Sequence, residues 1–254
     1  MIKLTRFAFA AAAITLALPA VASPKPVPIS AAVAASDRSA DNVKMDASRK
    51  PGAVLSYLGL RSGMTAIDLF GGNRYWAEIM APVVGPKGRV IVWEPRQFYD
   101  ADSEKAFVAY TVKHPNVSIE STPFEAISLP KDTADFVMLN LNYHDTYWES
   151  TKYKIPRMDP AKFLKVVYAA MKPGAVIGVI DHVANPNSDT RATVEKYHRI
   201  DPNVVRADFE RAGFRFAGSS NLLRNSADKH DLMVFDPKIR GSTDRFIFKF
   251  RKPR

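Results

Sequence analysis

Short apolar runs alternate along the chain with segments in which apolar residues have helical spacing. In the clearest stretch, an apolar run over 65–70 leads through Gly71-Gly72 into a predicted helix, Tyr75–Val84, and then into a second apolar run, 89–93. We interpret this order as strand, tight turn, helix and strand. Glu94 closes the second strand, about 20 residues after the turn, where an acid can accept hydrogen bonds from ribose hydroxyls. The stretch is therefore typical of one half of a doubly wound nucleotide site.

The same alternation continues to the end of the chain. It predicts an α/β fold of the Rossmann-like class, with a mainly parallel sheet and helices on both of its faces. Ligands of such sheets bind at the carboxyl ends of the strands, where polar residues gather in this sequence. The later predicted strands are 117–119, 136–139, 175–180, 214–217, 232–235 and 246–250, and the clearest predicted helices lie within 51–59, 95–113, 159–171 and 202–212.

The first 22 residues have the pattern of a signal peptide. Lys3 and Arg6 form a positively charged start, residues 7–18 form an apolar run, and residues 20–22 fit a cleavage site after Ala22. The apolar run is shorter than the ~20 residues that a membrane-spanning helix needs, although an uncleaved anchor is the alternative. We therefore expect a periplasmic or secreted protein with no stable membrane span after signal removal.

The remaining chain divides into a linker and one domain. Residues 23–42 are rich in Ala, Pro and Ser and are predicted to be a linker that contains a short helix near 31–35. Residues 43–254 are predicted to form the folded domain. A hydrophobic content of 46% over 254 residues supports one core of this size.

Charge and cysteine content exclude several kinds of site. The net charge is +10, but basic residues are scattered, and the only dense basic run is 249–254. No interleaved aromatic and basic pattern indicates nucleic-acid binding, so we expect a small-molecule substrate and leave the oligomeric state open. The chain has no cysteine, which excludes disulfides, thiolate chemistry, lipidation at cysteine and cysteine metal sites.

Three of the five histidines follow predicted strands or lie in a segment that can fold over the same edge. His144 follows the fourth strand, His182 follows the fifth, and His198 lies in the sequence KYHRID. Asp145 and Asp181 are next to the first two and could orient them. A neutral imidazole can act as a general base or as a metal ligand. The alternative is that His182 and His198 only form hydrogen bonds with loop carbonyls.

At this point the sequence resembles class I S-adenosylmethionine-dependent methyltransferases, and most of all the exported "predicted methyltransferase" group of proteobacteria. The resemblance runs from about Asp46 to the C-terminus. It implies a seven-stranded sheet whose last strand is antiparallel, with S-adenosyl-L-methionine as the cofactor. The matching text is ASRKPG, GMTAIDL, GGNRYWAE, GRVIVWEP, NYHD, KPGAVIGVIDH, HRID, AGF and TDRFIFKFRKP.

The resemblance also implies roles for individual residues. Asp68 and the turn at Gly71 and Gly72 would lie near the methionine part of the cofactor, and Glu94 would bind the ribose. Phe124 would lie near the adenine. Asn140 would lie beneath the pocket of the methyl donor.

The glycine turn departs from the family pattern. That pattern reads Asp-x-Gly-x-Gly-x-Gly, and its three glycines align with Phe70, Gly72 and Arg74 when the acid is Asp68. A phenylalanine could fill part of the pocket, and an arginine adds bulk and positive charge near a sulfonium cofactor. Either the turn is rearranged or the cofactor site is weakened.

Two hypotheses from different classes follow. The first is a methyltransferase that acts on a small or exported acceptor, with His144, Asp145 and His182 as the candidate catalytic residues and no assigned metal site. Methyl transfer needs mainly in-line positioning, so a base is optional. The alternative is a non-catalytic protein on the same scaffold that binds another small ligand, or a metal through His144, His182 and an aspartate. Fold alone cannot decide between them.

Overall fold

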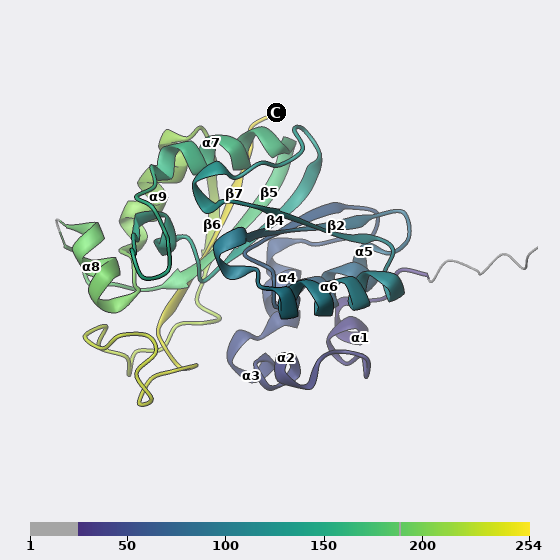
Figure 1. Cartoon of the computed structure of the whole chain (residues 1–254), viewed down its shortest axis with the longest axis horizontal. Coiled ribbons are helices and arrows are strands. Elements are labelled where there is room, and N and C mark those ends of the chain that lie inside the picture. The colour runs from purple at the N-terminus through teal and green to yellow at the C-terminus, as the bar shows by residue number, and fades with distance from the viewer. Residues whose placement is uncertain (1–24, 188) are drawn as a thin grey trace, which may run out of the picture.

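One seven-stranded sheet forms the centre of the protein. The computed structural model describes residues 25–187 and 189–254, so the predicted signal peptide, 1–22, lies outside the described residues. The strand order is β3-β2-β1-β4-β5-β7-β6 (Figure 1), in which the first five strands are parallel and β7 is antiparallel to both β5 and β6. The predicted fold class is therefore confirmed. The strands are β1 (Thr65–Leu69), β2 (Arg89–Pro95), β3 (Val117–Thr122), β4 (Ala134–Asn140), β5 (Met171–His182), β6 (Arg215–Ser220) and β7 (Arg245–Arg251).

Helices cover both faces of the sheet (Figure 1). One group comprises α1 (Ile29–Val33), α2 (Ala40–Lys44), α3 (Asp46–Arg49), α4 (Pro51–Leu58), α5 (Tyr75–Val84) and α6 (Ala101–Lys113). The other comprises α7 (Pro160–Ala170), α8 (Thr190–Tyr197) and α9 (Pro202–Arg211). Three short 3-10 helices follow strand ends: η1 (Arg96–Phe98), η2 (Phe124–Ala126) and η3 (His144–Tyr147). No helix in the described residues is long and apolar enough to cross a membrane.

The alternating side chains of each strand divide the interior into two cores. In β1, Ile67 and Leu69 belong to the core beneath α7 and α9, whereas Ala66 belongs to the core beneath α4 and α5. Neighbouring side chains of a strand point to opposite faces, so Asp68 lies on the α4 and α5 side with Ala66. The same alternation in β2 places Glu94 on that side, two residues after Val92.

The segment expected to be a linker is packed onto the domain from residue 25 onward. The α1 helix lies against α5, and Ala32 is fully buried between them. The amide of Val27 donates a 3.1 Å hydrogen bond to the carbonyl of Pro82. The side chain of Asn42 donates to the carbonyl of Asn73 in the turn after β1. The segment from residue 25 therefore packs against the domain, because the apolar face of α1 covers α5, and the domain boundary at residue 43 stays a prediction.

The strand predicted at 232–235 is also wrong. This segment forms bends and turns within the long connection between β6 and β7. Its apolar residues do not share one environment, since Val234 is buried whereas Phe235 is 55% exposed. The amide of Val234 donates a hydrogen bond to the carbonyl of Tyr197, but this segment does not pair with a neighbouring strand. The run of four apolar residues thus predicted a strand in a segment that forms turns.

The packing of Leu58 in α4 against Gly178 in β5 predicts that a larger residue at position 178 lowers stability. A Cβ atom on Gly178, in the middle of β5, would lie 2.3 Å from Cδ1 of Leu58. We expect Gly178→Val to lower the free energy of unfolding by about 1–3 kcal/mol through overpacking. Gly52→Ala is the control, because its Cβ would meet only Val33 at 3.9 Å and alanine is favoured in a helix. Urea denaturation measures both, and a Gly178→Val protein as stable as the unmodified one would contradict this packing.

Candidate functional site

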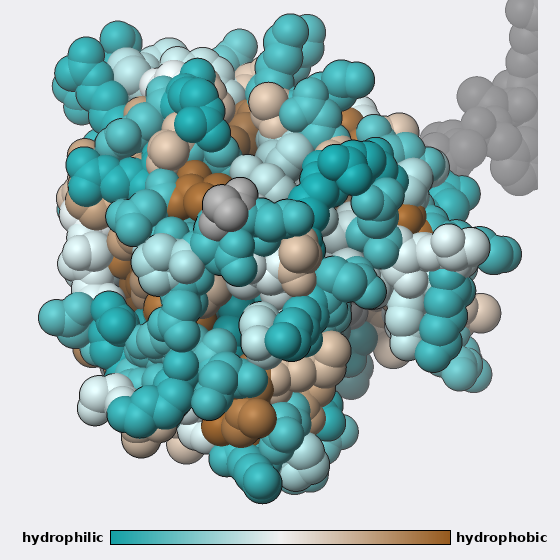
Figure 2. All heavy atoms as spheres, turned by 90° about the vertical axis from the view of Figure 1, so that its left-hand side faces the viewer, coloured by the Kyte–Doolittle hydropathy of each residue, from teal (hydrophilic) through white to brown (hydrophobic). Residues whose placement is uncertain are grey.

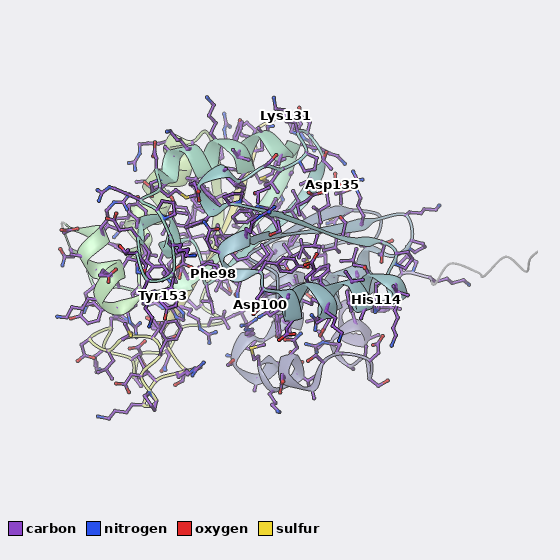
Figure 3. The ribbon with its side chains drawn as sticks, in the orientation of Figure 1. Phe98, Asp100, His114, Lys131, Asp135 and Tyr153 are labelled. Atoms are coloured by element: carbon purple, nitrogen blue, oxygen red, sulfur yellow. The ribbon has the colours of Figure 1, made fainter. Side chains whose placement is uncertain are left out.

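The carboxyl ends of the parallel strands lie on one edge of the sheet, and the candidate residues gather there. Phe98 and Asp100, which follow β2, mark this edge in Figure 3, and Tyr153 lies on the same side of the molecule. His114 lies at the far end of α6, on the opposite edge (Figure 3). Of the sequence-predicted candidates, the structure places Asp68, Gly71, Gly72, Glu94, Asn140, His144, Asp145 and His182 at or just after the carboxyl ends of β1, β2, β4 and β5.

The turn after β1 keeps a glycine-like backbone without glycine at its two changed positions. Phe70 has φ +58° and Arg74 has φ +65°, both in the left-handed region. An L-residue in this region costs about 1–2 kcal/mol. The turn is held by hydrogen bonds from the amide of Phe70 to the carbonyl of Trp93 (2.7 Å) and from the amide of Arg74 to the carbonyl of Gly71 (2.8 Å). Both positions therefore have the left-handed backbone that favours glycine, although neither residue is glycine.

Gly71 and Gly72 bring the main chain against two carboxyl groups. A Cβ on Gly71 would lie 2.5 Å from Oδ2 of Asp68, and a Cβ on Gly72 would lie 2.7 Å from Cδ of Glu94. The amide of Gly72 donates a 2.8 Å hydrogen bond to Oε2 of Glu94. Oδ2 of Asp68 is buried and has no hydrogen-bond partner among the described residues. Only glycine fits at 71 and 72, and one carboxylate oxygen has an unused acceptor position.

Burial raises the pKa of both acids. Burial, with a smaller contribution from the charge of Glu94, raises the pKa of Asp68 to about 8, although Arg49 and the amide of Ala77 act in the opposite direction. Burial also raises the pKa of Glu94 to about 7; the Gly72 amide opposes this shift and the charge of Asp145 adds to it. A positively charged ligand here would relieve the cost of holding these carboxylates in ionised form.

The changed side chains of the turn point away from the two acids. The ring of Phe70 packs against those of Trp93 (centroids 5.1 Å apart), Phe124 (5.6 Å) and Phe163 (6.2 Å), in the core beneath α7. The guanidinium of Arg74 lies 3.9 Å from Oε1 of Glu78. Phe70 therefore fills space beside η2, where Phe124 is fully buried as part of the same aromatic cluster.

Asp181 holds His144 in a fixed orientation. Its Oδ1 lies 2.7 Å from Nδ1 of His144, and its Oδ2 accepts a 2.9 Å hydrogen bond from the His144 amide. Burial opposes a charge on His144, but the carboxylates of Asp181 and Asp145 outweigh burial and raise its pKa to about 9. The imidazole is therefore protonated at neutral pH when no cation replaces the proton. A protonated imidazole does not accept a further proton, so the raised pKa disfavours the role of general base for His144, which stays a prediction.

His182 is held separately. Its Nδ1 lies 2.7 Å from the hydroxyl oxygen of Thr243, and burial lowers its pKa to about 3. The centroid of its ring is 6.0 Å from that of His144. One potential ligand atom each of His144, Asp145 and His198 lies within 4.8 Å of the others, and His182 is not part of this group.

A buried ion pair fixes the segment that carries His198. The next residue, Arg199, is fully buried and lies 2.9 Å from Oδ2 of Asp228 in the β6–β7 connection. Its guanidinium also donates to the carbonyls of Val183 and Leu232. The position of His198 therefore depends on a contact between residues far apart in the sequence.

Comparison with solved structures identifies the fold. A SAM-dependent methyltransferase from Aquifex aeolicus is 19% identical, with a TM-score of 0.56 over 84% of this chain and 100% of its own. An arsenic(III) S-adenosylmethionine methyltransferase from Chlamydomonas reinhardtii is 16% identical, with a TM-score of 0.56 over 90% of this chain and 74% of its own. The chain has the fold of S-adenosylmethionine-dependent methyltransferases.

Similarity at this level is limited to the methyltransferase fold. The [4+2]-cyclase SpnF, 16% identical and with a TM-score of 0.56, matches over 82% of each chain, so one fold accommodates more than one reaction. A scan of protein-family models finds no match, and a search of curated proteins finds none either. Any function must therefore be argued from the residues at the strand ends.

The strand-end residues fit the cofactor of this methyltransferase fold. The free Oδ2 of Asp68 and the two glycines without room for a Cβ form a cradle beside a carboxylate. Arg49 adds a cation that sequence reasoning missed; it lies 4.2 Å from the ring centre of Tyr75 and is close enough to Asp68 to lower the pKa of that acid. Its position in the quoted ASRKPG text was the available signal. Asn140 is half-buried at the end of β4. Its side chain has no hydrogen bond within the described residues, so its position beneath the methyl donor stays a prediction.

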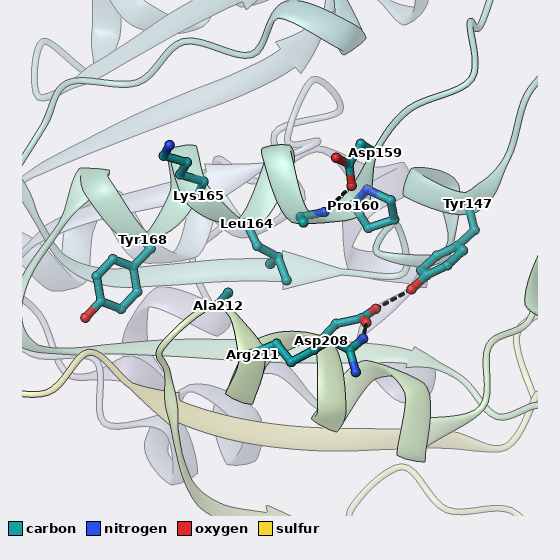
Figure 4. Close-up of a pocket in the computed structure, with 10 residues that line it drawn as sticks. Tyr147, Asp159, Pro160, Leu164, Lys165, Tyr168, Asp208, Arg211 and Ala212 are labelled. Atoms are coloured by element: carbon teal, nitrogen blue, oxygen red, sulfur yellow. Dashed lines mark hydrogen bonds and ion pairs between the residues drawn. The ribbon is translucent and has the colours of Figure 1, made fainter.

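A separate cavity of about 460 Å³ lies between α7 and α9 (Figure 4). Among the residues that line it, Tyr147 donates a hydrogen bond to Asp208, and Arg211 pairs with the same aspartate. Tyr143 also donates to Asp208, at 2.8 Å. These contacts fix η3, which carries His144, against α9. The neighbouring molecular face in Figure 2 is mainly hydrophilic with small separate hydrophobic patches, so it does not display a broad apolar docking surface.

The raised pKa of Asp68 predicts a pH dependence of stability. A carboxyl group with a pKa of about 8 when folded, and about 4 when unfolded, binds more proton in the folded state between these values. Stability should therefore fall as the pH rises from 5 to 9. We expect Asp68→Asn to lose less stability over this range and to be more stable than the unmodified protein at pH 9, by about 1–3 kcal/mol.

Denaturant titrations at several pH values measure this effect. Asp41→Asn is the control, because Asp41 is an exposed aspartate that pairs with Lys44 at the surface. That variant should retain the slope of the unmodified protein. An identical slope for Asp68→Asn and Asp41→Asn would contradict the assigned burial of the Asp68 charge.

Proposed function

We propose that the protein is an S-adenosylmethionine-dependent methyltransferase that acts on a small-molecule or exported acceptor. The observation that carries the proposal is the cradle at the carboxyl ends of β1 and β2. There, Gly71 and Gly72 lie directly on the carboxyl groups of Asp68 and Glu94, and Oδ2 of Asp68 has no partner among the described residues. Two acids, one turn backbone and a nearby arginine match the charges of an amino acid joined to a nucleoside.

Each residue has a role that follows from its charge. Asp68 would accept hydrogen bonds from the amino group of the methionine part, and Arg49, close to Asp68, would bind its carboxylate. Glu94 would accept hydrogen bonds from the ribose hydroxyls, because its carboxylate is positioned by the bond from the Gly72 amide to Oε2. The half-buried Phe70 ring would form part of an apolar wall on the adenine side, with the buried Phe124 and Trp93 rings packed behind it.

The cofactor supplies a methyl group on a sulfonium, and the chain supplies position and charge. A cation at this edge would favour the ionised forms of Asp68 and Glu94, whereas Arg74 lies near Glu78. In-line placement of the acceptor is the main requirement of methyl transfer. His144 and Asp145 lie next to this edge, because the charge of Asp145 reaches Glu94, and they can orient an acceptor there.

Calorimetric titration of S-adenosylmethionine and S-adenosylhomocysteine into the purified protein tests the proposal. We expect micromolar binding, and we expect Glu94→Gln and Arg49→Gln each to weaken it by about 10–100-fold, as for the loss of a hydrogen bond to a charged group. Glu104→Gln, an exposed surface change on α6, is the control and should bind normally. Folded protein that binds neither ligand would overturn the proposal, as would equal affinity in all the variants.

We further propose that this is an exported methyltransferase of the proteobacterial group it resembles, with residues 1–22 removed in the periplasm or on secretion. The support is the charged start, the apolar run and the Ala-Val-Ala sequence before Ser23. Intact-mass measurement on protein from the periplasmic fraction should give a chain that begins at Ser23. A full-length chain that remains in the cytosolic fraction would contradict export.

A further inference from the structure

We infer that His144, Asp145 and His198 form a binding site for one divalent transition-metal ion of the zinc class, with a coordination position open to water or to an oxygen atom of a small molecule. One ligand atom from each residue lies within 4.8 Å of the other two. The site lies at the same strand-end edge as Glu94, but its residues are not those of the proposed cofactor cradle.

The distance between the first two ligands fits a bound ion better than a direct hydrogen bond. Nε2 of His144 and Oδ1 of Asp145 are 3.4 Å apart, which is long for a charge-assisted hydrogen bond. Two ligands with metal bonds of about 2.0–2.2 Å in tetrahedral geometry are roughly 3.3–3.5 Å apart. An ion at this position therefore needs no change in the separation of the two atoms.

Outer contacts hold both ligands in the orientation that metal binding requires. Nδ1 of His144 is 2.7 Å from Asp181, which leaves Nε2 directed toward Asp145. A metal-binding histidine typically gives its second nitrogen to a carboxylate in this way. The side-chain amide of Asn142 donates a 2.9 Å hydrogen bond to Oδ2 of Asp145 and leaves Oδ1 free to face the histidine.

His198 completes the group from a strained backbone position. It ends α8 with φ +50° and ψ +49°, which is uncommon for a residue other than glycine. Such strain persists only where the surroundings fix it, and the buried pair of Arg199 and Asp228 fixes the next residue. The ring is half-buried beside Trp148 (centroids 5.1 Å apart), so a rotation about its side-chain bonds can close the remaining distance to the ion.

The kind of ion follows from the ligands. Two imidazoles and one carboxylate favour zinc, iron(II), manganese(II) or cobalt(II) over magnesium or calcium, which prefer all-oxygen sites. Three protein ligands leave at least one open position, as at catalytic zinc sites. The charge of Asp145 reaches Glu94, so the ion would lie beside the cofactor cradle. That the open position receives the methyl acceptor rests on the proposed function; that the ion binds does not.

Metal titration of chelator-treated, cofactor-free protein tests the inference. We expect one Zn²⁺ per chain with micromolar or tighter affinity, and visible absorption bands when Co²⁺ is bound. Loss of a residue that only hydrogen-bonds a metal ligand lowers affinity about 10–100-fold. His198→Gln and Asp145→Asn remove a ligand itself and should weaken Zn²⁺ binding by at least this factor. His182→Gln, beside the cluster, and His114→Gln, on the opposite edge, are the matched controls and should bind as the unmodified protein does.

Failure of the metal site and failure of the proposed methyltransferase give different results in these two titrations. Unmodified folded protein that takes up no Zn²⁺ or Co²⁺ would overturn the metal site even if S-adenosylmethionine binds. Binding that His198→Gln and Asp145→Asn leave unchanged, or that His182→Gln abolishes, would also overturn it. Uptake of one ion without cofactor binding would support the site and would remove the proposed methyltransferase. Circular dichroism checks that each variant is folded, and the Co²⁺ spectrum of the unmodified protein depends on no variant.

Discussion

The close approach of the turn after β1 to two buried carboxyl groups is the constraint on which the rest of the site depends. Gly71 and Gly72 have no room for a side chain because Asp68 and Glu94 lie directly beneath them. Burial of the two acids in one place is unfavourable for their charges, and it raises the pKa of both. A core selected only for stability would replace them with apolar residues, so their presence points to a ligand that carries positive charge and hydroxyl groups.

The turn holds two residues other than glycine in a backbone conformation that favours glycine. Phe70 and Arg74 occupy positions where the resembling family has glycine, and both adopt a left-handed backbone. The strain is offset by packing: the Phe70 ring joins Trp93 and Phe124 in the core. Arg74 lies near Glu78 and over the face of Tyr110. The two departures therefore alter the walls around the cradle and leave its backbone available.

A second set of contacts connects distant parts of the chain through Asp181. This aspartate is the next-to-last residue of β5. Its carboxylate contacts the ring and the amide of His144, which follows β4, and accepts a hydrogen bond from the amide of His182. The Arg199–Asp228 pair then joins the segment after α8 to the long β6–β7 connection. Removal of one member of such a buried pair is expected to destabilise the fold strongly, because the other charge would remain unpaired. The histidine edge is thus supported by contacts that join segments between residues 144 and 228.

Local pattern was sufficient to predict the order of most elements, a mainly parallel sheet, and the acids at the ends of β1 and β2, whereas the antiparallel last strand was implied by the family resemblance. Alternating apolar residues and helical spacing act over a few neighbouring positions, so they can be read from the sequence. The same reasoning did not predict that the segment 25–42 packs against a distant surface, and it failed where turns overrode composition, as at 232–235. Only the tertiary structure decided that His198 joins His144 and Asp145, that Asp181 orients His144, and that Arg49 lies beside Asp68. These contacts join residues from different strand ends and loops, and their partners are set by the packing of the whole sheet.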